Sequence, residues 1–264
     1  MSKYDISSLQ NPRVKQAVKL REDKRQRQRA GLMLVEGFDE ISLALSAGYQ
    51  PHTVFTAPEL TGRQISGLAV EPLTVNRLVF EKMSYRDNPD GWLAIFPIPK
   101  VTLDQLKLGD QPLVIVAESL EKPGNLGAIL RTADAAGVDL LLVCDPRVDI
   151  YNPNVVRASR GALFTLPVVE TDNASALTWL RSRGIQILAS TPSADNLYTH
   201  ADLRPPTAIA VGTEDEGLTQ FWLSNADVKV KIPMVGKVNS LNVSIAAGLL
   251  AYEAVRQRSH SSPA

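Results

Sequence analysis

The second half of the chain contains short runs of apolar residues, and each run is followed by a stretch with the composition of a helix. Runs that are apolar throughout, rather than at every second position, are typical of strands buried on both faces in a parallel sheet. Strands are expected at 113–117, 140–144, 185–189, 208–211 and 228–232, and a final helix at 240–258. The pattern therefore predicts an α/β fold built on a parallel sheet.

The first hundred residues predict a separate, smaller α/β unit. Strands are expected at 32–35, 52–56, 68–75 and 91–96, and helices at 38–45 and 77–83. The proline-rich segment from Phe96 to Lys100 then interrupts the pattern. The 264 residues suit two modest domains, so we expect a first domain at 1–105 and a second at 106–264.

Residues 1–31 are strongly basic, although the whole chain has 28 basic and 28 acidic side chains and no formal net charge. Asn11-Pro12 is a typical helix start and predicts one helix from Pro12 to about Arg29. Such a charge run is often only a solvated helix face. The interpretation that we favour is a surface that contacts the phosphates of a nucleic acid.

The composition argues against several classes of protein. Cys144 is the only cysteine, so a disulfide within the chain is impossible, and the histidines His52, His200 and His260 do not form a zinc-binding cluster. The N-terminus lacks the apolar stretch of a signal peptide, and no apolar run approaches the roughly 20 residues that span a bilayer. We expect a cytoplasmic protein with no metal and no membrane partner.

The segment from Glu121 to Gly137 follows an expected strand and opens a helix. Its glycines, Gly124 and Gly127, do not have the spacing of a dinucleotide-binding fingerprint. Arg131 lies farther along this helix. On spacing alone it is equally well explained as a surface cation paired with Asp134 three residues later.

The segment from Val211 to Thr219 has two glycines, Gly212 and Gly217, at the spacing of a P-loop. Leu218 stands where a P-loop has its phosphate-binding lysine, and the three acids of the loop would repel a triphosphate. This argues against a nucleoside triphosphatase and favours an uncharged or cationic ligand. An ordinary turn between a strand and a helix is the alternative.

A third segment, from Ile232 to Gly248, is expected to contain the end of a strand, a loop and the start of the last helix. Ser240 is a candidate helix cap, and Asn242 falls in the first turn of the expected helix. The small residues that follow, up to Gly248, allow another segment to pack closely.

Together, and in this order, the three segments resemble the SpoU (TrmH-like) family of RNA ribose methyltransferases in the SPOUT superfamily. The matching pieces are Asn125-Leu126-Gly127-Ala128-Ile129-Leu130-Arg131-Thr132, Gly212-Thr213-Glu214-x-x-Gly217-Leu218, and Ile232-Pro233-Met234 followed by Ser240-Leu241-Asn242-Val243-Ser244. Residues 152–159 also match, and the first hundred residues are similar to the family's N-terminal substrate-binding domain. Arg160 departs from the pattern, because relatives often have a small or apolar residue there, and it is a candidate for an added RNA contact.

This resemblance implies S-adenosyl-methionine-dependent 2′-O-methylation of a ribose in structured RNA by a homodimer. It implies rRNA rather than tRNA, because an added N-terminal domain more often accompanies action on rRNA. It also implies a deep trefoil knot that forms the cofactor site. A tRNA substrate and a non-catalytic RNA-binding or ribosome-assembly factor with the same fold are the alternatives.

The resemblance also assigns site residues. The catalytic residues that it implies are Arg131, Asn125, Ser240, Asn242 and Glu214. The cofactor-binding residues that it implies are Gly212, Thr213, Gly217, Ile232, Met234, Ser240 and Leu241. Because a guanidinium stays protonated, we expect Arg131 to hold phosphate or to stabilise a developing alkoxide. Assistance in deprotonation, which the family suggests, is the other possibility.

Overall fold

A computed structural model describes residues 3–213 and 215–259 of the chain. Within it the chain forms two compact units. The first contains the residues up to Lys100 together with Asp149–Thr165, and the second contains Val101–Val148 and the chain from Leu166 onward. The boundary expected at 105/106 assigns residues 149–165 to the second domain, whereas the compact units place this segment with the first.

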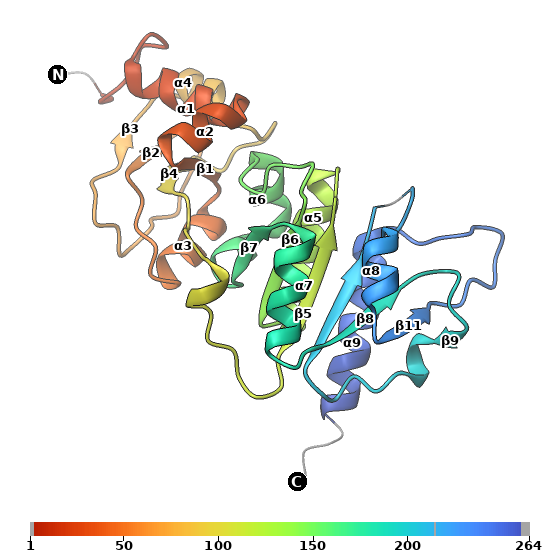
Figure 1. The fold of residues 1–264 in the computed structure, drawn as a ribbon. Coiled ribbons are helices and arrows are strands. Elements are labelled where there is room, and N and C mark those ends of the chain that lie inside the picture. The colour runs from red at the N-terminus through yellow and green to blue at the C-terminus, as the bar shows by residue number, and fades with distance from the viewer. Residues whose placement is uncertain (1–2, 214, 260–264) are drawn as a thin grey trace. The chain divides into compact units, whose positions relative to one another are not determined.

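The first unit is built on a sheet of four strands. Its order is β1 (Leu32–Glu36), β4 (Trp92–Pro97), β2 (Thr53–Thr56) and β3 (Leu73–Thr74). The β1–β4 and β4–β2 pairs are antiparallel, and β2–β3 is parallel. The helices of this unit are α1 (Pro12–Glu22), α2 (Lys24–Ala30), α3 (Phe38–Ser46), α4 (Arg77–Met83) and α6 (Pro153–Ser159) (Figure 1).

The single basic helix expected at 12–29 is instead two helices, because Asp23 interrupts it. The backbone of Asp23 is extended, with φ −120° and ψ 115°. Its N–H still donates to the carbonyl of Lys19 and closes α1, while its carboxylate accepts from the N–H of Arg25 and caps α2. An aspartate side chain that accepts from a nearby backbone N–H in this way favours a helix cap over a helix interior, so one helix ends and the next begins at Asp23.

Two arginines tie the 149–165 segment into the first unit. Arg27 is 2% exposed, and its guanidinium pairs with Asp149 at 2.5 Å while donating to the carbonyl of Leu20. Arg160 lies in the left-handed region with φ 55°, and its guanidinium faces the carboxylates of Asp39 and Glu40 at 3.7 and 3.8 Å. Arg27 is therefore not part of a phosphate-contacting surface, and the ion pairs of Arg160 hold it against α3.

The second unit is built on a seven-stranded sheet in which every pair is parallel. Its order is β7 (Val168–Thr171), β6 (Leu140–Cys144), β5 (Leu113–Glu118), β10 (Thr207–Val211), β8 (Gln186–Ser190), β11 (Val228–Lys231) and β9 (Asn196–Leu197). The five strands expected from apolar runs are confirmed. The edge strands β7 and β9 were not predicted, because they are short and contain polar residues.

Helices cover both faces of the parallel sheet. On one face, α7 (Asn173–Ser182) and α8 (Gln220–Asn225) pack through Trp179, Leu180 and Trp222. On the other, α5 (Pro123–Ala135) packs beside α9 (Val243–Ser259), where a Cβ at Gly248 would lie 3.2 Å from the Thr132 methyl carbon. None of the helices in the described part of the chain is long and apolar enough to cross a membrane.

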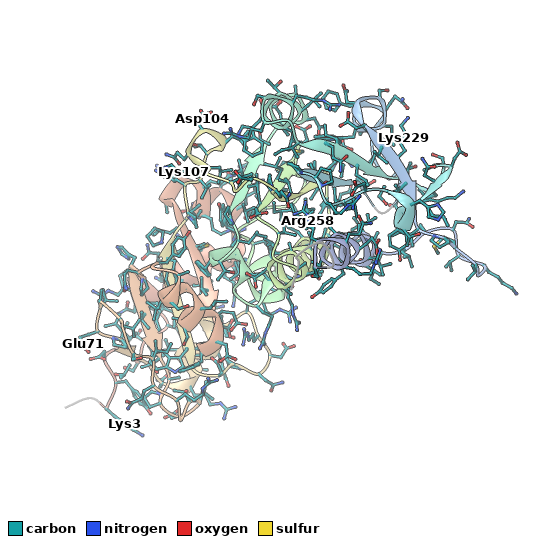
Figure 2. All side chains as sticks on the ribbon, turned by 90° about the horizontal axis from the view of Figure 1, so that it is seen from below. Lys3, Glu71, Asp104, Lys107, Lys229 and Arg258 are labelled. Carbon is teal, nitrogen blue, oxygen red and sulfur yellow. The ribbon has the colours of Figure 1, made fainter. Side chains whose placement is uncertain are left out.

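The last helix, α9, runs antiparallel to the strands, so its first turn and its last turn lie at opposite edges of the sheet. Arg258, labelled in Figure 2, lies near its end and donates to the carbonyls of Gln111 at 2.8 Å and Pro205 at 2.9 Å. These two carbonyls lie just before β5 and β10, at the amino ends of the strands. The first turn of α9 therefore lies at the carboxyl ends, where ligands bind in open parallel sheets.

Candidate functional site

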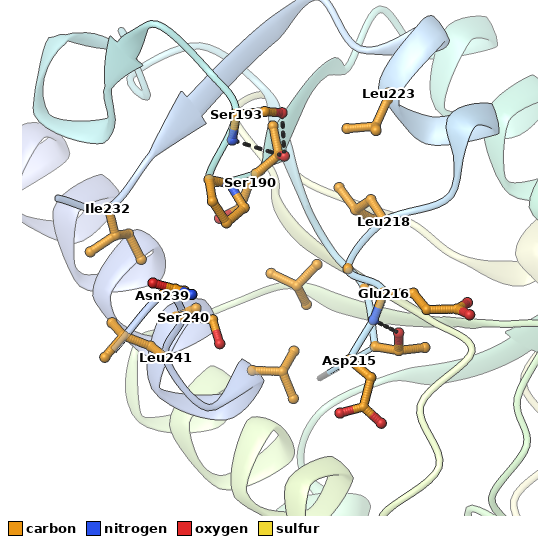
Figure 3. Close-up of a pocket in the computed structure, with 18 of the residues that line it drawn as sticks. Ser190, Ser193, Asp215, Glu216, Leu218, Leu223, Ile232, Asn239, Ser240 and Leu241 are labelled. Atoms are coloured by element: carbon orange, nitrogen blue, oxygen red, sulfur yellow. Dashed lines mark hydrogen bonds between the residues drawn. The ribbon is translucent and has the colours of Figure 1, made fainter. Parts of the chain in front are cut away.

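A pocket of about 540 Å³ opens at the carboxyl ends of β8, β10 and β11. Three loops and the start of α9 line it, and Figure 3 shows Ile232 and Leu241 across from Leu218. Of the residues expected to bind the cofactor, the pocket is lined by Gly212, Thr213, Gly217, Ile232, Met234, Ser240 and Leu241. The fold thus brings every one of these positions to one cavity, although two separate segments of the chain supply them.

The glycines of the 212–218 loop are required by its geometry. The N–H of Thr213 donates to the carbonyl of Gly217 at 3.0 Å, and the N–H of Gly217 returns a bond to Thr213 at 3.1 Å. Gly217 has φ +71°, a conformation that glycine adopts without strain. A Cβ at Gly212 would lie 2.0 Å from the Gly217 carbonyl oxygen. The loop therefore folds back on itself so tightly that position 212 has no room for a side chain.

Polar groups on the pocket wall come from the 212–218 loop, from the turn after β8 and from the loop before α9, which supplies Asn239 and Ser240. Asp215 and Glu216 are exposed pocket-lining acids, and the N–H of Glu216 donates to the Thr213 hydroxyl at 3.1 Å. The hydroxyls of Thr191 and Ser193 lie 3.0 Å apart on the β8 side (Figure 3). The sequence interpretation missed this turn, although a Ser-Thr-Pro-Ser run directly after an expected strand of a parallel sheet was a usable signal.

Two asparagines that lie far apart in the sequence meet near the start of α9. The amide nitrogen of Asn242 donates to the amide oxygen of Asn125 at 3.0 Å. The oxygen of Asn242 accepts from the N–H of Ser244 at 2.9 Å, so Asn242, rather than Ser240, caps the helix. Ser240 lies in the exposed loop before it and lines the pocket. The first and third motifs are therefore joined through two of the residues that the family resemblance assigns to catalysis.

Arg131 lies exposed on α5, six residues after Asn125. No ion pair joins it to Asp134 in the part of the chain that the structure describes. The guanidinium is therefore not held by the helix-surface contact that spacing alone suggested. Glu214, the remaining expected catalytic residue, lies outside the described residues. Within those residues, no group of three His, Cys, Asp or Glu side chains is arranged to hold a metal ion.

Comparison with models of known protein families shows to which family the chain belongs. The model of the SpoU rRNA Methylase family matches residues 112–252, more than half of the chain. The chain belongs to the SpoU family. A second model, the MRM3-like substrate binding domain, matches residues 11–94 of this SpoU protein.

Individual SpoU proteins resemble the chain over almost its whole length. The 23S rRNA (uridine(2479)-2′-O)-methyltransferase of Streptomyces viridochromogenes is 32% identical over 94% of this chain and 91% of its own. A crystal structure of an RNA 2′-O ribose methyltransferase is 42% identical, with a TM-score of 0.86 over 96% of this chain and 98% of that one. AviRb from S. viridochromogenes, in complex with AdoMet, is 30% identical, with a TM-score of 0.87 over 95% and 100% of the two chains. The α/β architecture with an N-terminal substrate-binding domain is thus that of the SpoU methyltransferases.

Proposed function

We propose that this SpoU protein transfers the methyl group of S-adenosyl-methionine to a ribose 2′-hydroxyl of ribosomal RNA. The observation that carries the proposal is the convergence of the motif residues: those expected to bind the cofactor line one pocket, and Asn125 and Asn242 are hydrogen-bonded at 3.0 Å. The SpoU relatives that act on RNA 2′-oxygens support the same reaction.

The pocket fits the proposed cofactor in size, shape and charge. Its volume of about 540 Å³ lies in the usual range for small-molecule sites. The absence of a side chain at Gly212 lets the backbone of the loop approach an adenosine, and Ile232 and Leu241 offer apolar walls. The acids Asp215 and Glu216 favour a cationic ligand over a triphosphate. When bound, S-adenosyl-methionine supplies an already activated methyl group.

The residues of the chain then have to place the ribose oxygen in line with that methyl group. Orientation of this kind supplies much of the rate of a transfer between two bound molecules. We assign the placing of the ribose to Asn125 and Asn242, which are hydrogen-bonded to each other, and Ser240 adds a hydroxyl. Arg131 stays protonated, so it acts by holding a phosphate or by stabilising negative charge on the 2′-oxygen.

We propose ribosomal RNA as the substrate and the N-terminal unit as its binding domain. The family model matched at residues 11–94 describes a substrate-binding domain, and the S. viridochromogenes relative acts on 23S rRNA. The exposed bases, sugars and phosphates of structured RNA suit recognition by shape and by basic side chains. The S. viridochromogenes relative acts on 23S rRNA, which bacteria make in the cytoplasm, so we place the protein there.

We also propose that the protein is a homodimer that pairs through α9. Ile245, Leu249 and Tyr252 recur at helical spacing along this helix and are 54%, 39% and 50% exposed. An exposed apolar stripe on an otherwise packed helix commonly marks a protein–protein contact. A second copy of the chain, which presents the same stripe, is the partner that family membership favours.

The trefoil knot is part of the same proposal. β10 lies between β5 and β8, and the chain after β11 returns to the pocket through residues 232–242 before α9 packs beside α5 on the other face. Residues 232–242 thus pass beside the 212–218 loop before α9 reaches the other face of the parallel sheet. This path supports a knot in which the last segment of the chain threads through an earlier loop. The knot would then explain why the second and third motifs line the same cavity.

Calorimetric titration with S-adenosyl-methionine tests the proposed function, with Gly212→Ala as the decisive variant. The wild type is expected to bind, and the variant to bind at least about tenfold more weakly, because the new Cβ overlaps the Gly217 carbonyl. Gly236→Ala is the matched control, since its Cβ would meet no heavy atom within 4 Å. Folded wild-type protein that binds neither the methyl donor nor its demethylated product would sink the proposal.

A further inference from the structure

Glu118 is a buried acid that the motifs do not include. It is the last residue of β5, it is 1% exposed, and it does not line the pocket. No lysine or arginine forms an ion pair with it in the described part of the chain. Burying a carboxylate without a cation is costly unless hydrogen bonds compensate it, so its partners indicate what it does.

Three donors converge on the two oxygens of this carboxylate. Oε2 accepts from the N–H of Thr219 at 2.8 Å, and Oε1 accepts from the Thr219 hydroxyl at 2.6 Å. Oε1 also accepts from the side-chain amide of Asn173 at 2.9 Å, and the amide oxygen of Asn173 accepts from the indole of the fully buried Trp222 at 2.7 Å. The network joins the end of β5 to the first residues of α7 and α8.

This contact fixes the end of the 212–218 loop. Thr219 directly follows Leu218, which lines the pocket, and Leu218 follows Gly217, whose carbonyl lies against Gly212. Thr219 occupies the cap position of α8 but makes no side-chain cap hydrogen bond, because its hydroxyl is committed to Glu118. With only six residues and no such cap, α8 holds the loop weakly by itself.

The same residue also begins the connection to α5. Ser119, the next residue, has φ 51°, and its N–H donates to the carbonyl of Cys144 at 2.8 Å. The chain then enters α5 at Pro123 and reaches Asn125 in the first turn. Glu118 thus stands where the loop that lines the cofactor pocket meets the segment that carries Asn125.

We propose that Glu118 is a positioning residue for methyl transfer. It holds Gly217 and Leu218 in the conformation that binds the cofactor and fixes their position relative to the start of α5. The assignment rests on the proposed function, because it concerns the same pocket. Glu118 does not line the pocket, so its effect passes through Thr219.

Glu118→Gln tests this role with almost no change in volume. An amide has a single acceptor oxygen, so at least one of the converging N–H or O–H groups loses its partner. The variant is expected to fold and to bind S-adenosyl-methionine about tenfold more weakly by calorimetry. Its affinity for RNA in the absence of cofactor is expected to equal that of the wild type.

A second pair of variants covers the case in which Glu118→Gln does not fold. Thr219→Val replaces the hydroxyl with a methyl group at an exposed position and is expected to weaken cofactor binding about threefold. Thr219→Ser keeps the hydroxyl and is expected to restore the wild-type affinity. Equal affinities for valine, serine and wild type would overturn the proposal.

Asp139→Asn is the matched control for a structural effect. Its carboxylate accepts from the N–H of Leu113 at 2.8 Å, at the opposite end of the same sheet. It is expected to lower the melting temperature without changing cofactor affinity. If Glu118→Gln binds the cofactor as tightly as the wild type, only the role of Glu118 is overturned. If the wild-type protein binds no cofactor, the proposed function is overturned.

Discussion

At the scale of single residues, the side chains of the candidate site differ in how firmly other parts of the chain hold them. Asn242 caps α9 and at the same time binds Asn125, so its position is set by both the helix and the partner motif. Arg131 has neither constraint, because it is exposed on α5 with no ion pair to Asp134 in the described residues. A guanidinium left available in this way is suited to a ligand that arrives from outside the chain.

Arg131→Ala is expected to abolish most methyl transfer while leaving the fold and cofactor binding nearly intact. The pocket is lined by other segments, and a cation that stabilises the reacting ribose acts mainly in the transition state. Loss of one such stabiliser typically lowers the rate about 100- to 1000-fold. Single-turnover methylation of the RNA substrate measures it, with Arg204→Ala, an exposed arginine paired to Asp202, as control. Rates within about threefold of wild type would show that Arg131 is not the catalytic arginine.

At the scale of elements, the break at Asp23 divides the basic N-terminal segment into two helices with a groove beside them. The groove, of about 370 Å³, is lined by residues of both helices, including Lys15 and Lys19. Lys24 and Arg25 are also exposed, whereas Arg27 is buried against Asp149. The exposed cations are available to phosphates, and Arg27 contributes to the stability of the first unit.

Replacing Lys15, Lys19, Lys24 and Arg25 by alanine is expected to weaken RNA binding and to flatten its dependence on salt. Each lost phosphate contact releases one fewer counterion and reduces the salt slope by about 0.7 to 0.9. Cofactor affinity is expected to stay the same.

Arg27→Ala is expected instead to destabilise the fold by about 3 to 5 kcal/mol, because it leaves Asp149 buried and unpaired. Filter binding over a salt series measures the RNA contact of the four exposed cations, and thermal unfolding measures the contribution of Arg27 to stability. An unchanged salt slope in the quadruple variant would mean that its four cations form only a solvated surface.

At the scale of the whole molecule, the apolar stripe on α9 leads to an expectation about assembly. Ile245→Glu with Leu249→Glu places two charges in the proposed interface and is expected to convert a dimer into a monomer in sedimentation experiments. Leu78→Glu is the control, because Leu78 is a comparably exposed leucine on α4, 63% exposed. A wild type that sediments as a monomer at micromolar concentration would contradict the homodimer.

Cys144 reports on the integrity of the second unit. The thiol is fully buried at the end of β6, and burial raises its pKa far above the ordinary value, with the nearby Asp145 adding to the effect. Because the thiolate is the reactive form, the folded protein is expected to resist alkylation at neutral pH. One thiol per chain is expected to react once denaturant unfolds the protein. Rapid labelling without denaturant would indicate that the sheet opens locally around β6.

The sequence by itself determined the elements whose signals are local. Apolar runs specified four of the five inner strands, because a strand buried on both faces allows few polar residues. The fifth, β11, alternates valine with Lys229 and Lys231. The spacing of Gly212 and Gly217 specified a tight loop. The edge strands escaped prediction because partial exposure admits polar residues. The break at Asp23 escaped because α2 contains only charged and polar residues before Ala30, so no apolar pattern marks where one helix ends and the next begins.

Only the tertiary structure decided which distant segments meet. The strand order β7-β6-β5-β10-β8-β11-β9 brings Glu118 to Thr219, and the return of α9 brings Asn242 to Asn125. Residues 149–165 follow β6 in sequence yet pack with the first unit, because Asp149 completes the buried ion pair of Arg27. Such contacts depend on long-range strand pairing and on burial, which no local pattern of side chains encodes.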